Sequence, residues 1–189
     1  MPKSALIVVD VQRDFCEGGA LAAVDTLSLL EPLRKTVEAA RRAGAVIVFT
    51  QDWHPANHSS FQANGGPWPV HCVANTPGAR LMEPMCALPE DVVIHKGVSV
   101  DGPGYSGFEA TGLAEKLKGL GVAQIAVSGI ATEYCVKATA LDAAKAQFDT
   151  VVLTDLLRAV QPGEAADVLA GLSEAGVKAE TAKEWLGTL

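Results

Sequence analysis

The sequence predicts a three-layer α/β/α fold built around a mainly parallel sheet. Strand-like runs alternate with helical patterns along the 189 residues, and no repeat or linker interrupts them. The strand-like runs are continuously apolar, as residues 5–9 illustrate, which is typical of strands buried on both faces of a parallel sheet. We therefore expect residues 1–189 to form a single domain with right-handed crossovers and the strand order 3-2-1-4-5-6.

Each expected element follows from its own pattern. The helix expected at 27–43 places its apolar residues on one face and is closed by Gly44. The segment 51–89 is rich in Pro, Asn, Gly and Trp and shows no sustained period, so we expect a long functional loop. The segment near Leu186 is expected either to pack against the core or to fray. We expect strands at 5–9, 45–50, 92–95, 123–128, 150–153 and 177–179, and helices at 27–43, 109–120, 132–146 and 163–175.

Composition and charge argue against several classes of protein. The net charge is −7 and no stretch is rich in Lys or Arg, so neither nucleic acid nor an anionic membrane surface is an expected partner. The first apolar run stops at Asp10, too early for a signal peptide, and no run could span a membrane, so we expect a cytoplasmic protein. The widely spaced Cys16, Cys72, Cys86 and Cys135 include no CxxC motif, which argues against a disulfide framework or a zinc ribbon. The low charge content is compatible with a homo-oligomer.

A cysteine stands at the start of the helix that is expected after the fourth strand. The strand-like run ends at Gly129, Thr132 is suited to cap the helix, and Cys135 follows in the first turn. Unpaired backbone N–H groups and the positive end of the helix dipole are expected to favour the thiolate, which is the nucleophilic form. Alternatively, Cys135 is a small buried residue that packs the start of the helix.

Chemically active side chains follow four of the expected strands, at the carboxyl ends where open α/β sheets bind ligands. Asp10 follows the first strand, Asp52 the second, His95 and Lys96 the third, and Cys135 the fourth. A carboxylate beside a thiol can accept its proton and later deliver it to a leaving amine, and a nearby ammonium stabilises the pair. Taken singly, Asp10 could instead cap a turn and Lys96 could be solvated. His95 is expected to be a hydrogen-bonded core residue.

The loop after the second strand holds three of the four histidines. Asp52 and His54 are two residues apart, so in an extended segment both side chains point to the same side. A further histidine of this loop, which also holds His58 and His71, completes a mixed carboxylate and imidazole set suited to Zn²⁺, Fe²⁺ or Mn²⁺. His58 is either a further ligand or a group that orients one, and Cys72 is a weaker candidate. Alternatively, these histidines are surface residues of a polar loop.

Two aromatic residues could complete a binding pocket. Phe15 lies in the loop after the first strand and Trp68 in the loop that holds the three histidines. A flat aromatic substrate could stack between them, or both could merely pack the loop.

Five motifs occur in order along most of the chain. They are DVQRDF at 10–15, QDWHP at 51–55, WPVHC at 68–72, KG at 96–97 and GIATEYCV at 129–136. In these motifs the chain resembles the nicotinamidases (pyrazinamidases) of the isochorismatase-like cysteine hydrolase family. The DWHP and WPxHC elements are the more specific ones, because the pattern of Asp, Lys and Cys also occurs in related amidases that lack the metal.

The resemblance implies the roles of the catalytic residues. Cys135 would be the nucleophile, Asp10 the general base and acid, and Lys96 their electrostatic partner. A cis peptide between Ile130 and Ala131 would turn the amides of Ala131 and Cys135 toward a developing oxyanion.

The resemblance also implies a metal site and a substrate site. One divalent ion, zinc first and iron or manganese as alternatives, would bind Asp52, His54 and His71, with His58 as a candidate further ligand. The substrate ring would contact Phe15, Trp68, Ala131 and Tyr134. Some relatives have a histidine in place of Tyr134, and the loop 101–108, which would line the pocket, departs from the family before Tyr105.

The implied reaction is hydrolysis of a small aromatic amide, nicotinamide and also pyrazinamide, to the carboxylic acid and ammonia through a cysteine thioester. One alternative is a metal-independent amidase of the same family that acts on a carbamoyl or ureido compound. Another is a non-catalytic metal- or ligand-binding α/β domain. The DWHP and WPVHC motifs argue against the first alternative, and the catalytic residue types at three strand ends argue against the second.

Overall fold

Six parallel strands form one sheet in the computed structural model, which describes residues 3–102 and 104–189. The order β3-β2-β1-β4-β5-β6 confirms the prediction. The strands are β1 (Lys3–Val9), β2 (Val46–Asp52), β3 (Val92–Lys96), β4 (Val122–Ile130), β5 (Asp149–Arg158) and β6 (Lys178–Glu180).

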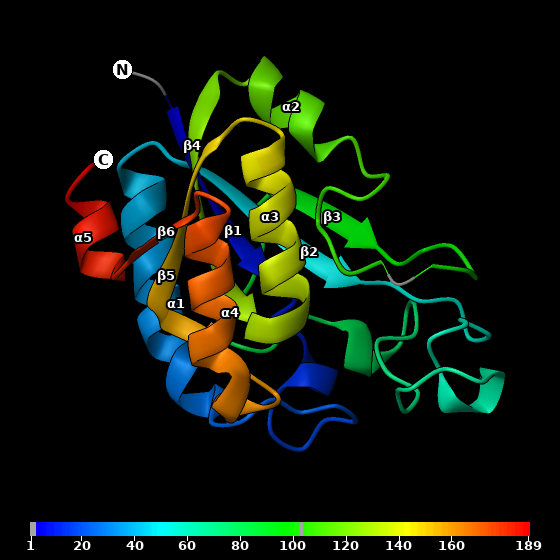
Figure 1. The fold of residues 1–189 in the computed structure, drawn as a ribbon. Coiled ribbons are helices and arrows are strands. Elements are labelled where there is room, and N and C mark those ends of the chain that lie inside the picture. The colour runs from blue at the N-terminus through cyan, green and yellow to red at the C-terminus, as the bar shows by residue number, and fades with distance from the viewer. Residues whose placement is uncertain (1–2, 103) are drawn as a thin grey trace.

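Helices cover both faces of the sheet (Figure 1). Alternate residues of β1 face opposite layers: Leu6 and Val8 join the apolar cluster that includes α1 and α5, whereas Ile7 and Val9 join the cluster that includes α2, α3 and α4. No helix among the described residues combines the length and apolar character needed to cross a bilayer. The helices are α1 (Thr26–Arg42), α2 (Leu113–Gly119), α3 (Lys137–Lys145), α4 (Ala165–Glu174) and α5 (Ala182–Leu186).

The long loop expected at 51–89 lies beyond the carboxyl ends of β1, β2 and β3, at the lower right of Figure 1. It contains short 3₁₀ turns at Gln62–Asn64 and Pro77–Ala79. Two isolated bridges, His54 with Val73 and Phe61 with Trp68, tie its segments together. The loop is therefore an ordered layer at the end of the sheet where ligands are expected.

Two helices, α2 and α3, begin at least four residues later than predicted. α2 starts at Leu113 and not at residue 109, because Ala110 and Gly112 adopt left-handed conformations with φ of 54° and 71°. The helix expected from residue 132 opens with a π-helical turn, Thr132–Val136, before α3 begins. Its N-cap is Ala131 and no side chain caps it, so the prediction that Thr132 caps this helix is wrong.

The end of the chain packs against the core. Thr181 and Glu184 form a capping box, in which Glu184 Oε2 accepts the Thr181 N–H at 2.8 Å and Thr181 Oγ1 accepts the Glu184 N–H at 3.3 Å. The helix α5 that follows places Trp185 in the core, where its Nε1 donates to Gln124 Oε1 at 3.2 Å. Of the two outcomes expected near Leu186, packing is the one observed.

Replacing Trp185 by Ala is expected to lower the free energy of unfolding by about 3–5 kcal/mol, because the change empties a fully buried site and removes a hydrogen bond. Urea unfolding followed by circular dichroism measures the loss. Lys183→Ala, at an exposed position of the same helix, is the matched control and should stay within about 0.5 kcal/mol of the parent. Equal effects of the two substitutions would show that α5 does not contribute to the core.

Candidate active site

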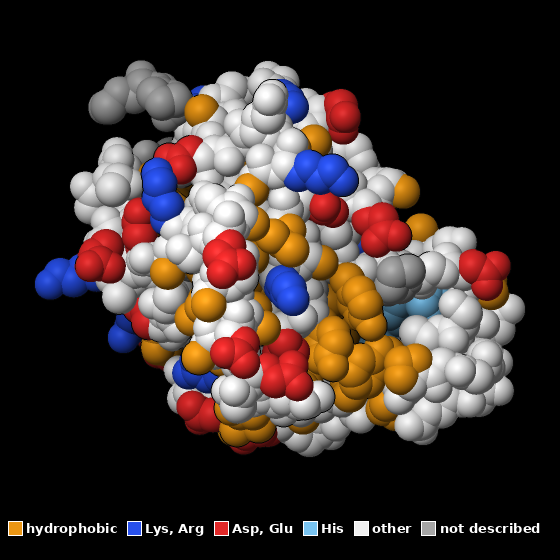
Figure 2. Space-filling view, in the orientation of Figure 1, with side chains coloured by type: hydrophobic (Ala, Val, Ile, Leu, Met, Phe, Trp, Pro, Cys, Tyr) orange, Lys and Arg blue, Asp and Glu red, His pale blue; other side chains and the backbone are white. Residues whose placement is uncertain are grey.

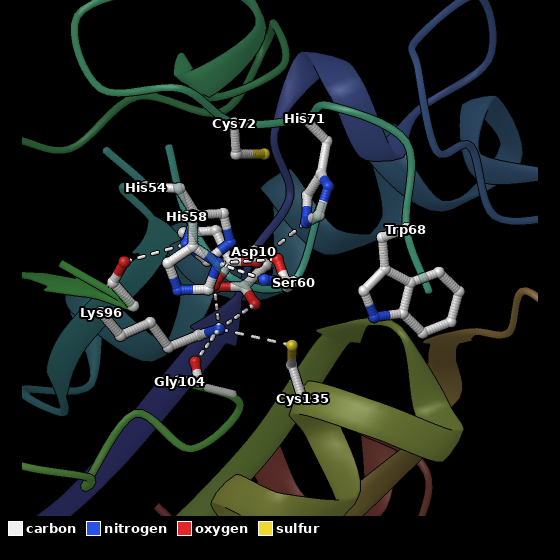
Figure 3. A network of polar contacts seen from close by, with 12 residues as sticks. Asp10, His54, His58, Ser60, Trp68, His71, Cys72, Lys96, Gly104 and Cys135 are labelled. Carbon is white, nitrogen blue, oxygen red and sulfur yellow. Dashed lines mark hydrogen bonds and ion pairs between the residues drawn. The ribbon is translucent and has the colours of Figure 1, made fainter. Parts of the chain in front are cut away.

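Three strand ends bring an ammonium, a carboxylate and a thiol together (Figure 3). Asp10 directly follows β1, Lys96 is the last residue of β3, and Cys135 lies in the π-helical turn after β4. Lys96 Nζ lies 2.8 Å from Asp10 Oδ2 and 3.3 Å from Cys135 Sγ. All three residues are buried, so water is largely excluded from this cluster.

The Lys96 ammonium also holds two further acceptors. It donates to Asp52 Oδ1 at 2.5 Å and to the Gly104 carbonyl at 3.0 Å. Burial opposes a charge on Lys96, but the carboxylates of Asp10 and Asp52 outweigh it and raise the pKa of the ammonium well above its usual value. Burial likewise opposes the charge on Asp52, yet the pKa of that carboxyl is lowered, first by Lys96 and then by His54. A permanent cation therefore sits between two carboxylates.

The two oxygens of Asp10 have different surroundings. Oδ1 accepts the Thr50 hydroxyl at 2.7 Å, and the Asp10 N–H donates to the Thr50 carbonyl at 3.2 Å. Oδ2 has the Lys96 ammonium beside it but forms no well-aligned hydrogen bond with a described residue. Carboxylate oxygens of Asp10 and Asp52 lie within 4.8 Å of the Cys135 sulfur. The Asp10 carboxylate is thus close enough to the thiol to exchange a proton with it.

Burial and nearby carboxylates act against the thiolate form of Cys135. Burial raises the pKa of the Cys135 thiol well above its usual value, Lys96 offsets this only in part, and the charges of Asp10 and Asp52 raise it further. The contribution expected from the start of the helix, which favours the thiolate, is opposed at this site by desolvation and by two carboxylates. Burial also raises the pKa of Asp10, which makes that carboxylate a better proton acceptor.

Asp52, His54 and His71 form a second cluster, in which one atom from each residue lies within 4.8 Å of the others. Asp52 Oδ2 is 3.3 Å from His54 Nε2 and 3.9 Å from His71 Nε2. The Nδ1 atoms of His54 and His71 lie 2.9 Å from the Gly97 carbonyl and 2.7 Å from the Pro69 carbonyl. Because a carbonyl only accepts, each Nδ1 carries a proton, so Nε2 is the ring atom of each histidine that could bind a metal ion. A carboxylate and two such imidazoles fit a divalent metal ion.

Gly97 is required for this arrangement. Its φ is 62°, and a Cβ at this position would lie 2.4 Å from the His54 ring. A side chain here would therefore displace His54 from the carbonyl that orients it.

His58 differs from the other two histidines of the loop. Its ring stacks on that of His54 with 4.0 Å between centroids. Its Nδ1 accepts the Ser60 backbone N–H at 3.2 Å and lies 2.7 Å from Ser60 Oγ. In the neutral ring the proton is then on Nε2, which is buried without a partner among the described residues. His58 thus lies beside the metal-ligand cluster, and its role as a ligand stays a prediction.

Two other residues from the sequence analysis lie outside the metal-ligand cluster. Cys72 is buried, and its N–H donates to Asp14 Oδ2 at 2.7 Å. His95 is exposed and stacks on Trp53 at 4.1 Å between centroids. The expectation that His95 is a hydrogen-bonded core residue is wrong, because β3 is an edge strand and alternate residues of it face solvent.

A cavity adjoins both clusters, because Asp52, His54, His71 and Cys135 all lie in its lining. Hydrophobic side chains gather on the surface between the lower end of α3 and the loop region (Figure 2). The lining of the cavity contains all four residues expected to contact a substrate ring, Phe15, Trp68, Ala131 and Tyr134, together with Tyr105. It also contains Leu21, Ser60 and Val160, which the sequence analysis missed.

The turn before Cys135 has the backbone that the resemblance implies. The peptide between Ile130 and Ala131 is cis. The Ala131 N–H forms no hydrogen bond with another described residue, and both Ala131 and Cys135 line the cavity. A polar backbone donor is therefore free beside the thiol.

Sequence reasoning assigned no role to two polar residues of the 10–15 motif. Gln12 is buried; its Oε1 accepts the Asp52 N–H at 2.8 Å, and its Nε2 donates to the carbonyls of Asp52 and Ala79. Asp14 accepts the Cys72 N–H next to His71. These side chains hold the segments that carry the metal-ligand cluster. Their polar character was the available signal, but their partners are 40 to 67 residues away along the chain.

Comparisons with known proteins agree with this geometry. The sequence model of the isochorismatase domain matches residues 4–184. A nicotinamidase of Escherichia coli is 36% identical over 208 aligned residues, covering 98% of each chain. A crystal structure of a Pyrococcus horikoshii pyrazinamidase in complex with zinc has 43% identity and a TM-score of 0.92, covering 95% of this chain and 99% of its own. The PnC1 protein of L. infantum in complex with nicotinate has 36% identity and a TM-score of 0.88, covering 96% and 94%. On sequence and on fold, therefore, the chain belongs to the isochorismatase-domain family.

Proposed function

We propose that this protein is a nicotinamidase, which hydrolyses nicotinamide, and also pyrazinamide, to the carboxylic acid and ammonia. The observation that supports this most is a single cavity lined by the Cys135 sulfur, the metal-ligand cluster and aromatic side chains, with Asp10 and Lys96 directly behind the sulfur. The similarity to relatives named nicotinamidase and pyrazinamidase over nearly the whole chain supports the same substrate class.

The proposed reaction has two halves. Asp10 Oδ2 accepts the Cys135 proton as the sulfur attacks the amide carbon, and the resulting oxyanion accepts hydrogen bonds from the amides of Ala131 and Cys135. Asp10 then donates its proton to the nitrogen, and ammonia leaves a thioester on the sulfur. Asp10 next accepts a proton from water as the resulting hydroxide attacks the thioester. The carboxylic acid then leaves, and Asp10 returns its proton to the sulfur, which restores the thiol.

Lys96 allows this proton transfer to take place near neutral pH. Its ammonium lies beside both the donor sulfur and the acceptor oxygen, so it offsets the negative charge wherever the proton resides. Without the cation, two carboxylates would share a buried site and one of them would take up a proton.

Asp52, His54 and His71 would hold the metal ion, for which we propose zinc, because both imidazoles direct Nε2 toward the Asp52 carboxylate and the P. horikoshii relative is in complex with zinc. Iron and manganese suit the same donor set. When bound, the ion supplies an electrophilic anchor for a ring nitrogen of the substrate. Phe15, Trp68 and Tyr134 would contact the faces and edge of the ring.

Replacing Cys135 by Ala is expected to lower ammonia release from nicotinamide by roughly 10⁴-fold or more, since the thioester cannot form. Circular dichroism should show an unchanged fold, because the substitution is small. The assay includes a carbamoyl and a ureido compound beside nicotinamide. Residual turnover near the parent rate would remove Cys135 from the mechanism, and preference for the ureido or carbamoyl compound would favour the alternative amidase.

Replacing Lys96 by Met is expected to lower kcat/KM by roughly 10²- to 10⁴-fold, because Asp10 then holds a proton and cannot act as a base. Methionine has a similar length and no charge, so the packing is largely kept. Initial rates at saturating and limiting nicotinamide measure the effect. A variant with near-parent kcat would show that the ammonium is not needed for proton transfer.

Replacing His71 by Ala is expected to reduce bound metal from about one ion per chain to a small fraction of that, because a three-residue donor set loses a ligand. Elemental analysis of the purified protein measures the content and the identity of the metal. His95→Ala removes an exposed histidine outside the metal-ligand cluster and should retain the parent content. His58→Ala distinguishes a ligand, which would lower the content strongly, from a neighbour, which would not.

A further inference from the structure

Three aromatic side chains contact one another along one side of the cavity, and we name Trp68, Tyr105 and Tyr134 the aromatic wall. The Trp68 indole Nε1 donates to the Tyr105 hydroxyl at 3.2 Å. The rings of Trp68 and Tyr134 meet edge to face, with 5.1 Å between centroids and an interplanar angle of 87°. The ring centroids of Tyr105 and Tyr134 are 5.7 Å apart. All three line the cavity, and they come from three separate segments of the chain.

The backbone of Trp68 is fixed independently of its ring. Its N–H donates to the Ser60 carbonyl at 3.0 Å, and its own carbonyl accepts the Gln62 N–H at 2.7 Å. These two bonds leave the side-chain dihedral angles unconstrained, and the indole has a single polar atom, a donor. Among the described residues, the Tyr105 hydroxyl is the partner of that donor. The orientation of the indole therefore depends on where Tyr105 places its oxygen.

The backbone just before Tyr105 is held by contacts of Gly104. The carbonyl of the preceding residue, Gly104, accepts the Lys96 ammonium at 3.0 Å. Gly104 has a φ of 61°, and a Cβ there would lie 2.4 Å from the Gly97 Cα, so the two backbone segments are in close contact. The same short segment thus contacts the catalytic ammonium through Gly104 and the aromatic wall through Tyr105.

We propose that Tyr105 is a positioning residue for the substrate ring: by accepting the indole N–H, its hydroxyl holds Trp68 in the orientation that binds the ring. This inference rests on the proposed function, because it takes a flat aromatic amide as the ligand. A ring held in place before binding loses less rotational freedom when the substrate arrives. The hydroxyl contacts the indole and not the reacting atoms, so it should affect ground state and transition state equally.

Tyr105→Phe tests the proposal, because it removes the hydroxyl and keeps the ring. A neutral hydrogen bond corresponds to a rise in the KM for nicotinamide of roughly 2- to 12-fold, with kcat within about twofold of the parent. In a Trp68→Phe background, which lacks the indole N–H, Tyr105→Phe should change KM no further. An unchanged KM, a fall in kcat alone, or additive effects of the two substitutions would overturn the proposal.

Tryptophan indole N–H resonances give a second readout that does not require turnover. Tyr105→Phe should shift the Trp68 resonance and leave that of Trp185, whose partner is Gln124, in place. Tyr134→Phe removes a hydroxyl that does not bond the indole and should shift Trp68 much less; equal shifts would overturn the proposal. If the parent protein fails to hydrolyse nicotinamide, the proposed function is wrong, and titration of nicotinate into the same samples then tests the positioning role. Weaker binding of nicotinate by Tyr105→Phe than by the parent supports that role. Equal binding by the two proteins, or no binding by either, overturns it.

Discussion

One buried ammonium determines how the rest of the site is arranged. Lys96 has a fully buried side chain, and a charge in that position is tolerated only when it is paired and hydrogen-bonded. Its partners are the side chains of Asp10, Asp52 and Cys135 and the carbonyl of Gly104. The parallel sheet places three strand ends around one point, and the ammonium compensates the charges that meet there.

The two carboxylates beside Lys96 are divided by their other contacts. Asp52 directs Oδ1 to the ammonium and Oδ2 to the two histidines, so both oxygens are engaged. Asp10 keeps Oδ2 without a well-aligned hydrogen bond, and its pKa is raised whereas that of Asp52 is lowered. Two carboxylates around one cation are thereby suited to different work, one to accept a proton and one to remain charged. Asp52 also connects the metal-ligand cluster to the catalytic cluster.

The sequence predicted what depends on local pattern and on the general rules of the fold. Continuous apolar runs alternating with helical patterns predicted the sheet and its strand order. The general rule that open α/β sheets bind ligands at the carboxyl ends of their strands predicted that Asp10, Asp52 and Lys96 lie close together. The beginning of α2 was missed because it depends on a left-handed Ala110, which no propensity indicates. The role of Gln12 was missed because its partners are distant in sequence, and Val160 joins the cavity only through the course of the loop after β5. The start of α5, in contrast, has a signal in the sequence, because Thr181 followed three residues later by Glu184 is the pattern of a capping box.

The state of the thiol shows why a local rule can fail inside a folded site. A helix terminus is worth about 0.3–1 kcal/mol at an exposed position, and only its first turn contributes. At Cys135 that turn is π-helical, the sulfur is buried, and two carboxylates are close, so the pKa of the thiol rises. Oxidants react with thiolates far faster than with thiols, so a raised pKa of the thiol disfavours the form that oxidants attack. In the proposed reaction Asp10 takes the proton only as the sulfur attacks. Burial, which disfavours the thiolate at rest, therefore limits formation of the thiolate to the step in which the substrate reacts.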